Sequence, residues 1–149
     1  METIIPYAMF EHLKKPVKSV DFDGVLHRSV VGTEPIDFMD PTKWKPFDEM
    51  IAHIKELSKD YYIVCVTARD SWNAPELERF IEMHDIPIQE LHCTDNEPKL
   101  DILLELNAET HYDDKREIGE ELAGSGIEFV LVNPHSKTWS VPEWWQKEK

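Results

Sequence analysis

Two acids, Asp21 and Asp23, stand two residues apart where an apolar run meets Gly24. Their carboxylates repel each other, and the glycine interrupts the β pattern, so this is a costly way to end a strand. A bound cation, together with a reaction for one of the acids, would account for the pair. The alternative is an Asp-Gly hairpin turn, which the same residues favour.

Other polar groups follow later apolar runs of the chain. Thr67 and Arg69 come after one run, Asp113 and Asp114 come after another, and Lys99 opens a predicted helix. Each has an ordinary interpretation, as a strand end, a helix amino-terminal cap or a solvated lysine. In an open parallel sheet, however, sites lie beyond the carboxyl ends of the strands. We therefore expect these groups to meet at one edge of a sheet.

Such a group of residues is typical of phosphoryl transfer. Closely spaced carboxylates suit a hard cation such as Mg²⁺, which brings positive charge to a phosphate. One aspartate can attack phosphorus and give an aspartyl-phosphate that water hydrolyses. A second acid can protonate the leaving oxygen and then deprotonate the water. Thr67 can donate to a phosphoryl oxygen, and Lys99 can neutralise developing charge.

Several neighbours of these residues have two interpretations. Arg69 either binds a substrate phosphate bidentately or pairs with an acid such as Asp70 or Glu76. His27 and His111 adjoin the site in the sequence and are candidates for substrate contact.

The segment between the first two apolar runs shows no helical period, and Gly32, Pro35, Pro41 and Pro46 interrupt it. Residues 25–45 are predicted to form a flap over the site, with 28–31 pairing against 35–38, or else an ordinary surface loop. Two tryptophans, Trp44 in this segment and Trp72 after Arg69, either stack on a base or pack in the core.

Apolar periodicity sets out the elements that must position these groups. Leu100, Leu103, Leu104 and Leu106 are predicted as the core side of one helix, and Ile118 and Leu122 as that of the next. Alternating strands and helices of about 10 residues favour an α/β fold, a Rossmann-like three-layer sandwich with a mainly parallel central sheet. The predicted strands cover residues 17–22, 61–66, 88–92, 110–112 and 129–132, and the predicted helices 47–57, 75–84, 97–106 and 115–123.

Length and composition bound the remaining possibilities. A chain of 149 residues suggests a single domain, 1–149, with 1–16 as an extension that includes a turn or two of helix at 7–15. The tail, 134–149, is Trp-rich and is expected to pack back on the domain; the alternative is an exposed site for a partner. Thirty acids against 16 bases disfavour extended nucleic-acid or anionic-membrane binding. Two cysteines, no signal peptide and no apolar run of about 18 residues fit a cytoplasmic protein.

The motifs resemble those of the haloacid dehalogenase-like (HAD) superfamily of hydrolases. Asp21-Phe22-Asp23-Gly24-Val25 resembles the first motif of that superfamily, Thr67 the second, Lys99 the third and Asp113-Asp114 the fourth. The resemblance extends from about residue 17 to 132. Residues 61–62, 67–69, 113–115 and 126–128 are also similar to the phosphatase half of polynucleotide kinase–phosphatases.

This resemblance implies a role for each residue. Asp21 would be the nucleophile and Asp23 the general acid and base, an acid that the dehalogenases of the superfamily lack. Magnesium would be held by Asp21, Asp113, the backbone carbonyl of Asp23 and Asp114, the last directly or through water.

The resemblance also implies the substrate site. Thr67, Ala68, Arg69 and Lys99 would bind the substrate phosphate. The chain leaves room for a minimal cap, the flap alone, and hence for an open site. The expected substrate is a nucleotide or a nucleic-acid terminal phosphate; the alternatives are a small phosphorylated metabolite, or binding of a phosphorylated ligand without turnover.

Overall fold

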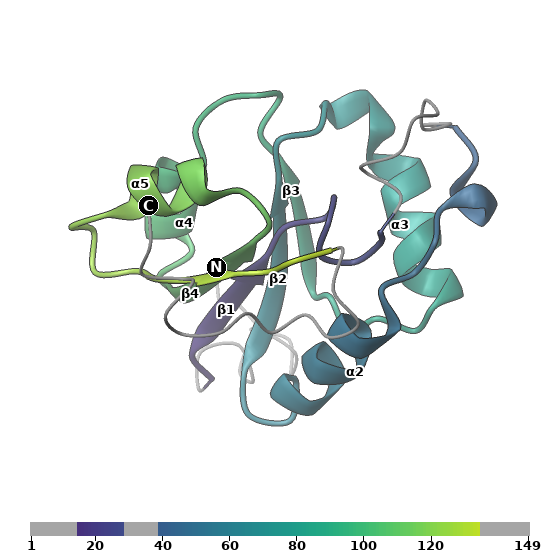
Figure 1. Ribbon diagram of the computed structural model, residues 1–149, viewed down its shortest axis with the longest axis horizontal. Helices are drawn as coiled ribbons and strands as arrows, with labels where there is room; N and C mark the ends of the chain where they lie inside the picture. The colour runs from purple at the N-terminus through teal and green to yellow at the C-terminus, as the bar shows by residue number, and fades with distance from the viewer. Residues whose placement is uncertain (1–14, 29–38, 135–149) are drawn as a thin grey trace, which may run out of the picture.

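The computed structural model describes residues 15–28 and 39–134, and these form a five-stranded parallel sheet with helices on both faces (Figure 1). The strand order is β3-β2-β1-β4-β5. The chain thus builds outward from β1 in one direction and then crosses to β4 on its other side. That reversal is where α/β sheets bind ligands, beyond the carboxyl ends of the strands. The strands are β1 (Val17–Val20), β2 (Tyr62–Thr67), β3 (Glu90–Cys93), β4 (Ala108–Asp113) and β5 (Glu128–Leu131).

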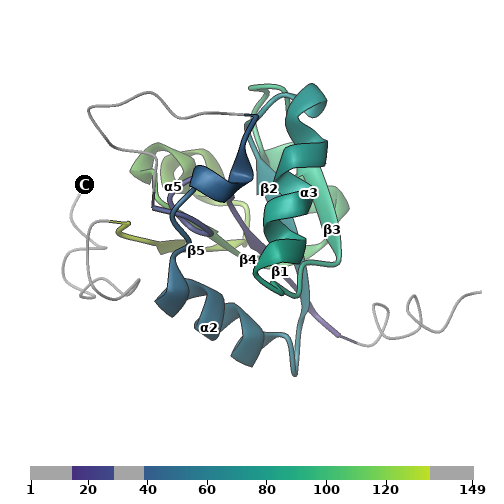
Figure 2. The same ribbon diagram turned by 90° about the vertical axis from the view of Figure 1, so that its right-hand side faces the viewer.

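Two helical layers cover the sheet, as Figures 1 and 2 show from two sides. Helices α2 (Asp48–Leu57) and α3 (Ala74–Met83) lie on one face, and α4 (Leu100–Glu105) and α5 (Arg116–Leu122) on the other. Each face has its own apolar cluster. The larger one contains Phe22, Phe47 and Phe80, and the smaller one contains Leu103 and Leu122. The predicted α/β Rossmann-like sandwich is confirmed.

The periodicity of the sequence accounts for these elements. Helix α2 buries Met50, Ile51 and Ile54, which repeat at the spacing of one helical face. Strand β2 is a continuous apolar run because it is central and covered on both sides. Burial of each such aliphatic or aromatic side chain stabilises the folded state by roughly 1.5–3 kcal/mol.

One predicted core position is wrong. Leu104 is 51% exposed, whereas Leu103 is fully buried. Helix α4 has six residues, and consecutive residues of a helix point about 100° apart. Only one face of so short a helix contacts the sheet. Leu103 occupies that face, and Leu104 points outward.

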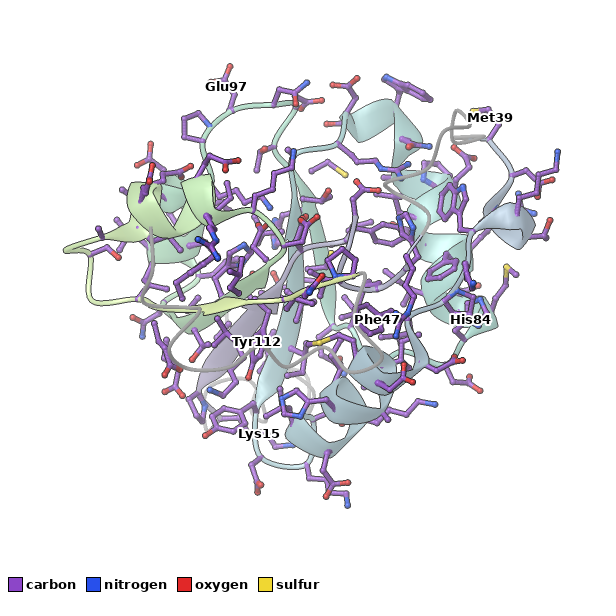
Figure 3. The ribbon with its side chains drawn as sticks, viewed as in Figure 1. Lys15, Met39, Phe47, His84, Glu97 and Tyr112 are labelled. Carbon is purple, nitrogen blue, oxygen red and sulfur yellow. The ribbon has the colours of Figure 1, made fainter. Side chains whose placement is uncertain are left out.

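Parts of both described ends of the predicted flap belong to the core. Val25, Leu26 and Trp44 are buried, and Pro41–Lys43 forms a 3-10 helix, η1. Figure 3 shows Phe47 in the interior, whereas Met39, which is 60% exposed, lies at the periphery. The middle of the predicted flap, 29–38, lies outside the described residues.

Some predictions lie outside the described residues. These are the helical turns at 7–15, most of the hairpin of 28–31 with 35–38, and the packing of the tail. Among the described residues, no helix has the length and apolar character needed to cross a membrane.

Candidate active site

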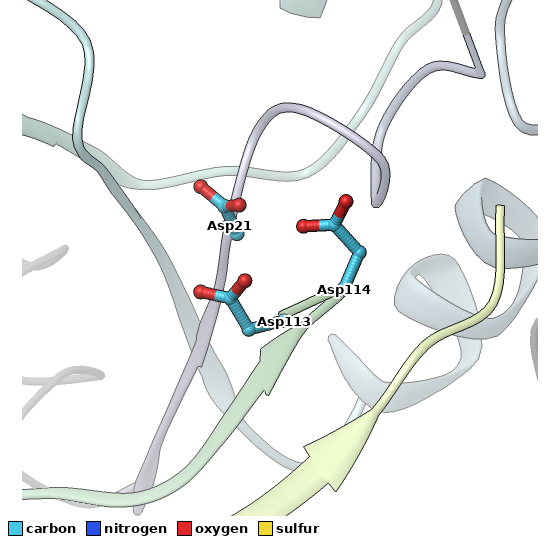
Figure 4. A group of neighbouring side chains, drawn as sticks. All are labelled: Asp21, Asp113 and Asp114. Carbon is cyan, nitrogen blue, oxygen red and sulfur yellow. The ribbon is translucent and has the colours of Figure 1, made fainter. Parts of the chain in front are cut away.

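Three carboxylates meet beyond the ends of β1 and β4, at the reversal of the sheet (Figure 4). Asp21 follows β1, Asp113 is the last residue of β4, and Asp114 comes next. One oxygen from each lies within 4.8 Å of those of the others. The main chain fixes the arrangement, since the Asp21 N–H donates to the Tyr112 carbonyl at 2.8 Å. We call these three residues the carboxylate cluster.

Lys99, just before α4, reaches into the cluster and is 3% exposed. Its ammonium donates to Asp113 Oδ2 at 2.7 Å and lies 3.1 Å from Asp21 Oδ1. Burial alone would lower the pKa of Lys99, but the charges of Asp21 and Asp113 raise it above its ordinary value. The lysine thus stays charged and holds two strand ends together.

The three acids titrate differently. Burial, and next the charge of Asp113, raise the pKa of Asp21 well above its ordinary value, although Lys99 opposes them. The same two causes raise the pKa of Asp114 to about 7. Asp113 goes the other way: burial alone would raise its pKa, but donors from His111 and Lys99 hold it below its usual range.

One carboxylate of the cluster, that of Asp114, has an oxygen without a partner in the described part of the chain. Asp114 Oδ1 is buried and has no hydrogen-bond partner among the described residues. Gly24 lies so close that a Cβ added there would overlap Asp114 Oδ2, and its φ of +78° also favours glycine. The predicted motif glycine is therefore needed for close approach of the two loops.

Asp23 belongs to a different group of side chains. Arg69 donates to both of its oxygens, from Nε at 2.9 Å and Nη2 at 2.5 Å, and His27 Nε2 lies 2.9 Å from Oδ1. Arg69 Nη1 also donates to Asn73 Oδ1 at 2.6 Å. Burial alone would raise the pKa of Asp23, but hydrogen bonds from Arg69 and His27 hold it far below its usual range. We call these four residues the Asp23 network.

The predicted phosphate-binding stretch forms a turn at the end of β2. Thr67 is buried, and its Oγ1 accepts the Arg69 N–H at 3.3 Å. The Asn96 N–H donates to the Ala68 carbonyl at 2.8 Å. Thus Thr67, Ala68 and Arg69 stand at the same sheet edge as the carboxylate cluster, and Arg69 pairs with Asp23 rather than with Asp70 or Glu76.

Four side chains with two interpretations now have a location. His27 and His111 are fully buried, so neither has surface with which to contact a substrate. Trp44 is 3% exposed and stacks on His27 at 5.6 Å, whereas Trp72 is 61% exposed. Trp44 is a packing residue, and Trp72 remains available to a ligand.

Sequence reasoning missed two polar residues. Ser19 hydrogen-bonds His111 across β1 and β4, and Asn73 orients Arg69. The signal for Ser19 was present, because alternation along β1 puts it on the same face as Asp21.

Comparison with known proteins identifies the fold. No family model matches the sequence, and no curated protein sequence matches it. Two chains from structures of the Pnkp1/Rnl/Hen1 complex, one described as an RNA repair complex, superpose with TM-scores of 0.66 and 0.65 at 18% and 17% identity. Each match covers 80% of this chain. An L-2-haloacid dehalogenase superposes with a TM-score of 0.50 at 13% identity over 70% of this chain.

These similarities concern the fold. The chain spans 43%, 46% and 53% of the matched chains, so each is the larger molecule. The predicted HAD-like fold is confirmed.

Proposed function

We propose that this chain is a Mg²⁺-dependent phosphatase that hydrolyses phosphate monoesters through an aspartyl-phosphate on Asp21. The observation that carries the proposal is the carboxylate cluster with Lys99 at the reversal of the sheet. A HAD-like fold supports it, since Asp21, Thr67, Lys99 and Asp113 occur at the positions that the motifs of that superfamily require.

The residues present fit a divalent cation. Three carboxylates against one ammonium leave two formal negative charges when all are ionised. The raised pKa values of Asp21 and Asp114 and the unpartnered Asp114 Oδ1 support a site for added positive charge there. Asp21, Asp113 and Asp114 would hold the ion, with the Asp23 carbonyl as a further candidate ligand. When bound, Mg²⁺ supplies positive charge beside the phosphate and lowers the cost of attack by an anion.

The chemistry divides between two aspartates. An Asp21 oxygen attacks phosphorus while the ester P–O bond breaks, and protonated Asp23 gives its proton to the leaving oxygen. Asp23 then takes a proton from water as the water oxygen attacks phosphorus. The bond from phosphorus to Asp21 breaks, which returns the carboxylate and releases phosphate. Lys99 and Thr67 donate to the phosphoryl group.

Asp23 can act as an acid only after its surroundings change. Arg69 and His27 keep it ionised without substrate. A substrate phosphate is a second acceptor for the guanidinium, and it weakens the Arg69–Asp23 pair where the two compete. Arg69 thus binds the phosphate and, by doing so, releases the acid.

The substrate that we favour is a nucleotide or a nucleic-acid terminal phosphate. Support comes from the structural similarity to chains of an RNA repair complex and from the exposed Trp72 beside the phosphate-binding turn. The formal charge of −14 opposes long contacts with nucleic acid but does not oppose binding of one terminus. A small phosphorylated metabolite is the second candidate. No membrane partner is proposed.

The test is hydrolysis of p-nitrophenyl phosphate with and without Mg²⁺. Wild type is expected to turn over only with metal, and Asp21→Asn to lose turnover. Asp60→Asn is the matched control, since Asp60 is exposed in the turn between α2 and β2, at the other end of the sheet. Equal rates for wild type and Asp21→Asn would overturn the assignment of Asp21 as the nucleophile.

Substrate class needs a second assay. We expect 3′-phosphorylated oligonucleotides or mononucleotides to be better substrates than a panel of phosphorylated metabolites. Binding of Mg²⁺ and phosphorylated ligands without phosphate release from any substrate would instead mean a binding protein.

A further inference from the structure

Ser19 and His111 form a buried polar pair behind the carboxylate cluster. They are in-register neighbours on β1 and β4, and both are fully buried. Ser19 Oγ lies 2.9 Å from His111 Nδ1, and His111 Nε2 lies 2.9 Å from Asp113 Oδ2. Because side chains alternate along a strand, His111 and Asp113 share the face of β4 that α4 and α5 cover.

The chemistry of these groups fixes the direction of one hydrogen bond. An ionised Asp113 only accepts, so His111 Nε2–H donates to it. The other ring nitrogen, Nδ1, has the Ser19 hydroxyl as its partner, and a hydroxyl can donate or accept. Ser19 thereby holds the His111 ring with Nε2 directed at Asp113.

The donors to Asp113 divide unequally between its two oxygens. Oδ2 receives both His111 and Lys99, at 2.9 and 2.7 Å, whereas Oδ1 receives the Lys115 N–H at 3.2 Å. The strongly bonded Oδ2 orients the carboxylate, and Oδ1 keeps a lone pair for a cation.

We propose that Ser19 and His111 are positioning residues that hold the Asp113 carboxylate in the orientation that binds the metal ion. The inference rests on the proposed magnesium site. Donors behind a ligating carboxylate fix its rotamer, and their loss typically weakens metal binding about 10–100-fold.

The same two strands offer a matched control. Lys18 and Thr110 are the preceding in-register pair, and Lys18 Nζ donates to Thr110 Oγ1 at 2.9 Å. Both are buried, but alternation directs them to the other face of the sheet, away from Asp113. Thr110→Val therefore removes the cross-strand hydrogen bonds of Thr110 with Lys18 and Glu128 without touching the cluster.

The experiment measures Mg²⁺ binding by calorimetry on the full chain without substrate, with unfolding temperature recorded in parallel. His111→Leu should weaken Mg²⁺ binding about 10–100-fold, and His111→Gln, whose amide can donate to Asp113, should restore most of it. Ser19→Ala should give a smaller loss in the same direction. Thr110→Val should lower the unfolding temperature and leave Mg²⁺ affinity unchanged.

The outcomes separate the two proposals. Should wild type fail to bind Mg²⁺, the metal site and this inference both fall. Should Asp113→Asn lose binding while His111→Leu binds as wild type does, the positioning role alone is overturned. Equal losses in His111→Leu and Thr110→Val would mean general loosening of the sheet and would also overturn it. If His111→Leu does not fold, Ser19→Ala decides, and unchanged affinity there counts against the proposal.

Discussion

Asp21 and Asp23 are two residues apart, and burial acts on both carboxylates, yet the charged groups around them differ. Burial, and next the charge of Asp113, raise the pKa of Asp21, although Lys99 opposes them. Burial alone would also raise the pKa of Asp23, but Arg69 and His27, beside the larger apolar cluster, hold it low. One turn thus supplies both a site short of positive charge and a site where the charge is already paired.

The difference explains how one motif can serve two reaction steps. In the free protein the two pKa shifts are opposite to those that the proposed chemistry needs, because a nucleophile must be ionised and an acid protonated. Metal at the carboxylate cluster favours ionised Asp21, and phosphate at Arg69 weakens the hold on ionised Asp23. On the proposed mechanism, the two aspartates reach their working states only when both metal and phosphate are bound.

The strongest test of this difference neutralises one acid of the carboxylate cluster and, separately, Asp23. Asp113→Asn should lose both Mg²⁺ binding and turnover. Asp23→Asn should lose turnover by about 10²–10⁴-fold, as expected when a general acid is removed. It should nevertheless bind Mg²⁺ as wild type does, because its side chain is outside the carboxylate cluster. Calorimetry and phosphatase assays on the same preparations check this. A loss of metal binding in Asp23→Asn would mean that the Asp23 network and the carboxylate cluster act as one site.

Removing the cation of the Asp23 network should destabilise the fold. Arg69→Gln leaves Asp23 without its bidentate partner in a pair whose side chains are 7% and 30% exposed. The free energy of unfolding should fall by about 2 kcal/mol, between the values for exposed and buried pairs. Lys59→Gln is the control, since it breaks an exposed pair with Glu56 and should change stability by less than about 0.5 kcal/mol. Similar urea midpoints for the two variants would contradict the expectation.

The pH dependence of stability should depend on metal. Without Mg²⁺, folded Asp21 and Asp114 retain protons that the unfolded chain releases above about pH 4. The contribution of Asp114 to stability therefore falls as the pH rises from about 4 to about 7, and the contribution of Asp21 changes in the same sense. The lowered pKa values of Asp23 and Asp113 act in the opposite sense and mainly at acid pH, where stability is lost as the pH falls.

Comparing unfolding with and without Mg²⁺ isolates the carboxylate cluster, because the metal-independent titration of other groups cancels. The rise in unfolding temperature on adding Mg²⁺ should be larger at pH 8 than at pH 6 by about 3 °C. Asp114→Asn should flatten this difference, since its side chain binds no proton in that range. A rise independent of pH in wild type would show that protons and metal do not compete there.

The sequence predicted which residues come together at the candidate site, because strand ends and parallel topology determine their positions. Asp21 and Asp113 meet since apolar runs end just before them and the sheet brings those ends together, and Lys99 reaches them from the start of α4. Pattern did not distinguish Asp23 from Asp21, because what separates them is contact with Arg69, 46 residues away. Nor did it reveal that His27 and Trp44 complete the core, since loop positions carry no period from which burial can be inferred.

The two tryptophans near the Asp23 network differ in exposure, and this difference allows a test of substrate binding. Trp44 stacks on His27, and the Arg69 guanidinium lies 5.0 Å from its ring centre, so its surface is already in use. Trp72 is 61% exposed, and its indole Nε1–H donates to Asp70 Oδ2 at 3.2 Å, which orients the ring.

If the substrate carries a base, Trp72→Ala should raise KM for a 3′-phosphorylated oligonucleotide about fivefold, the loss expected for one weak base stack. It should leave p-nitrophenyl phosphate turnover unchanged, because the phosphate contacts remain. Met39→Ala, at another exposed apolar side chain, is the control. An equal rise in KM for both substrates would mean that Trp72 shapes the phosphate-binding turn, and no rise for either would direct the search to small metabolites.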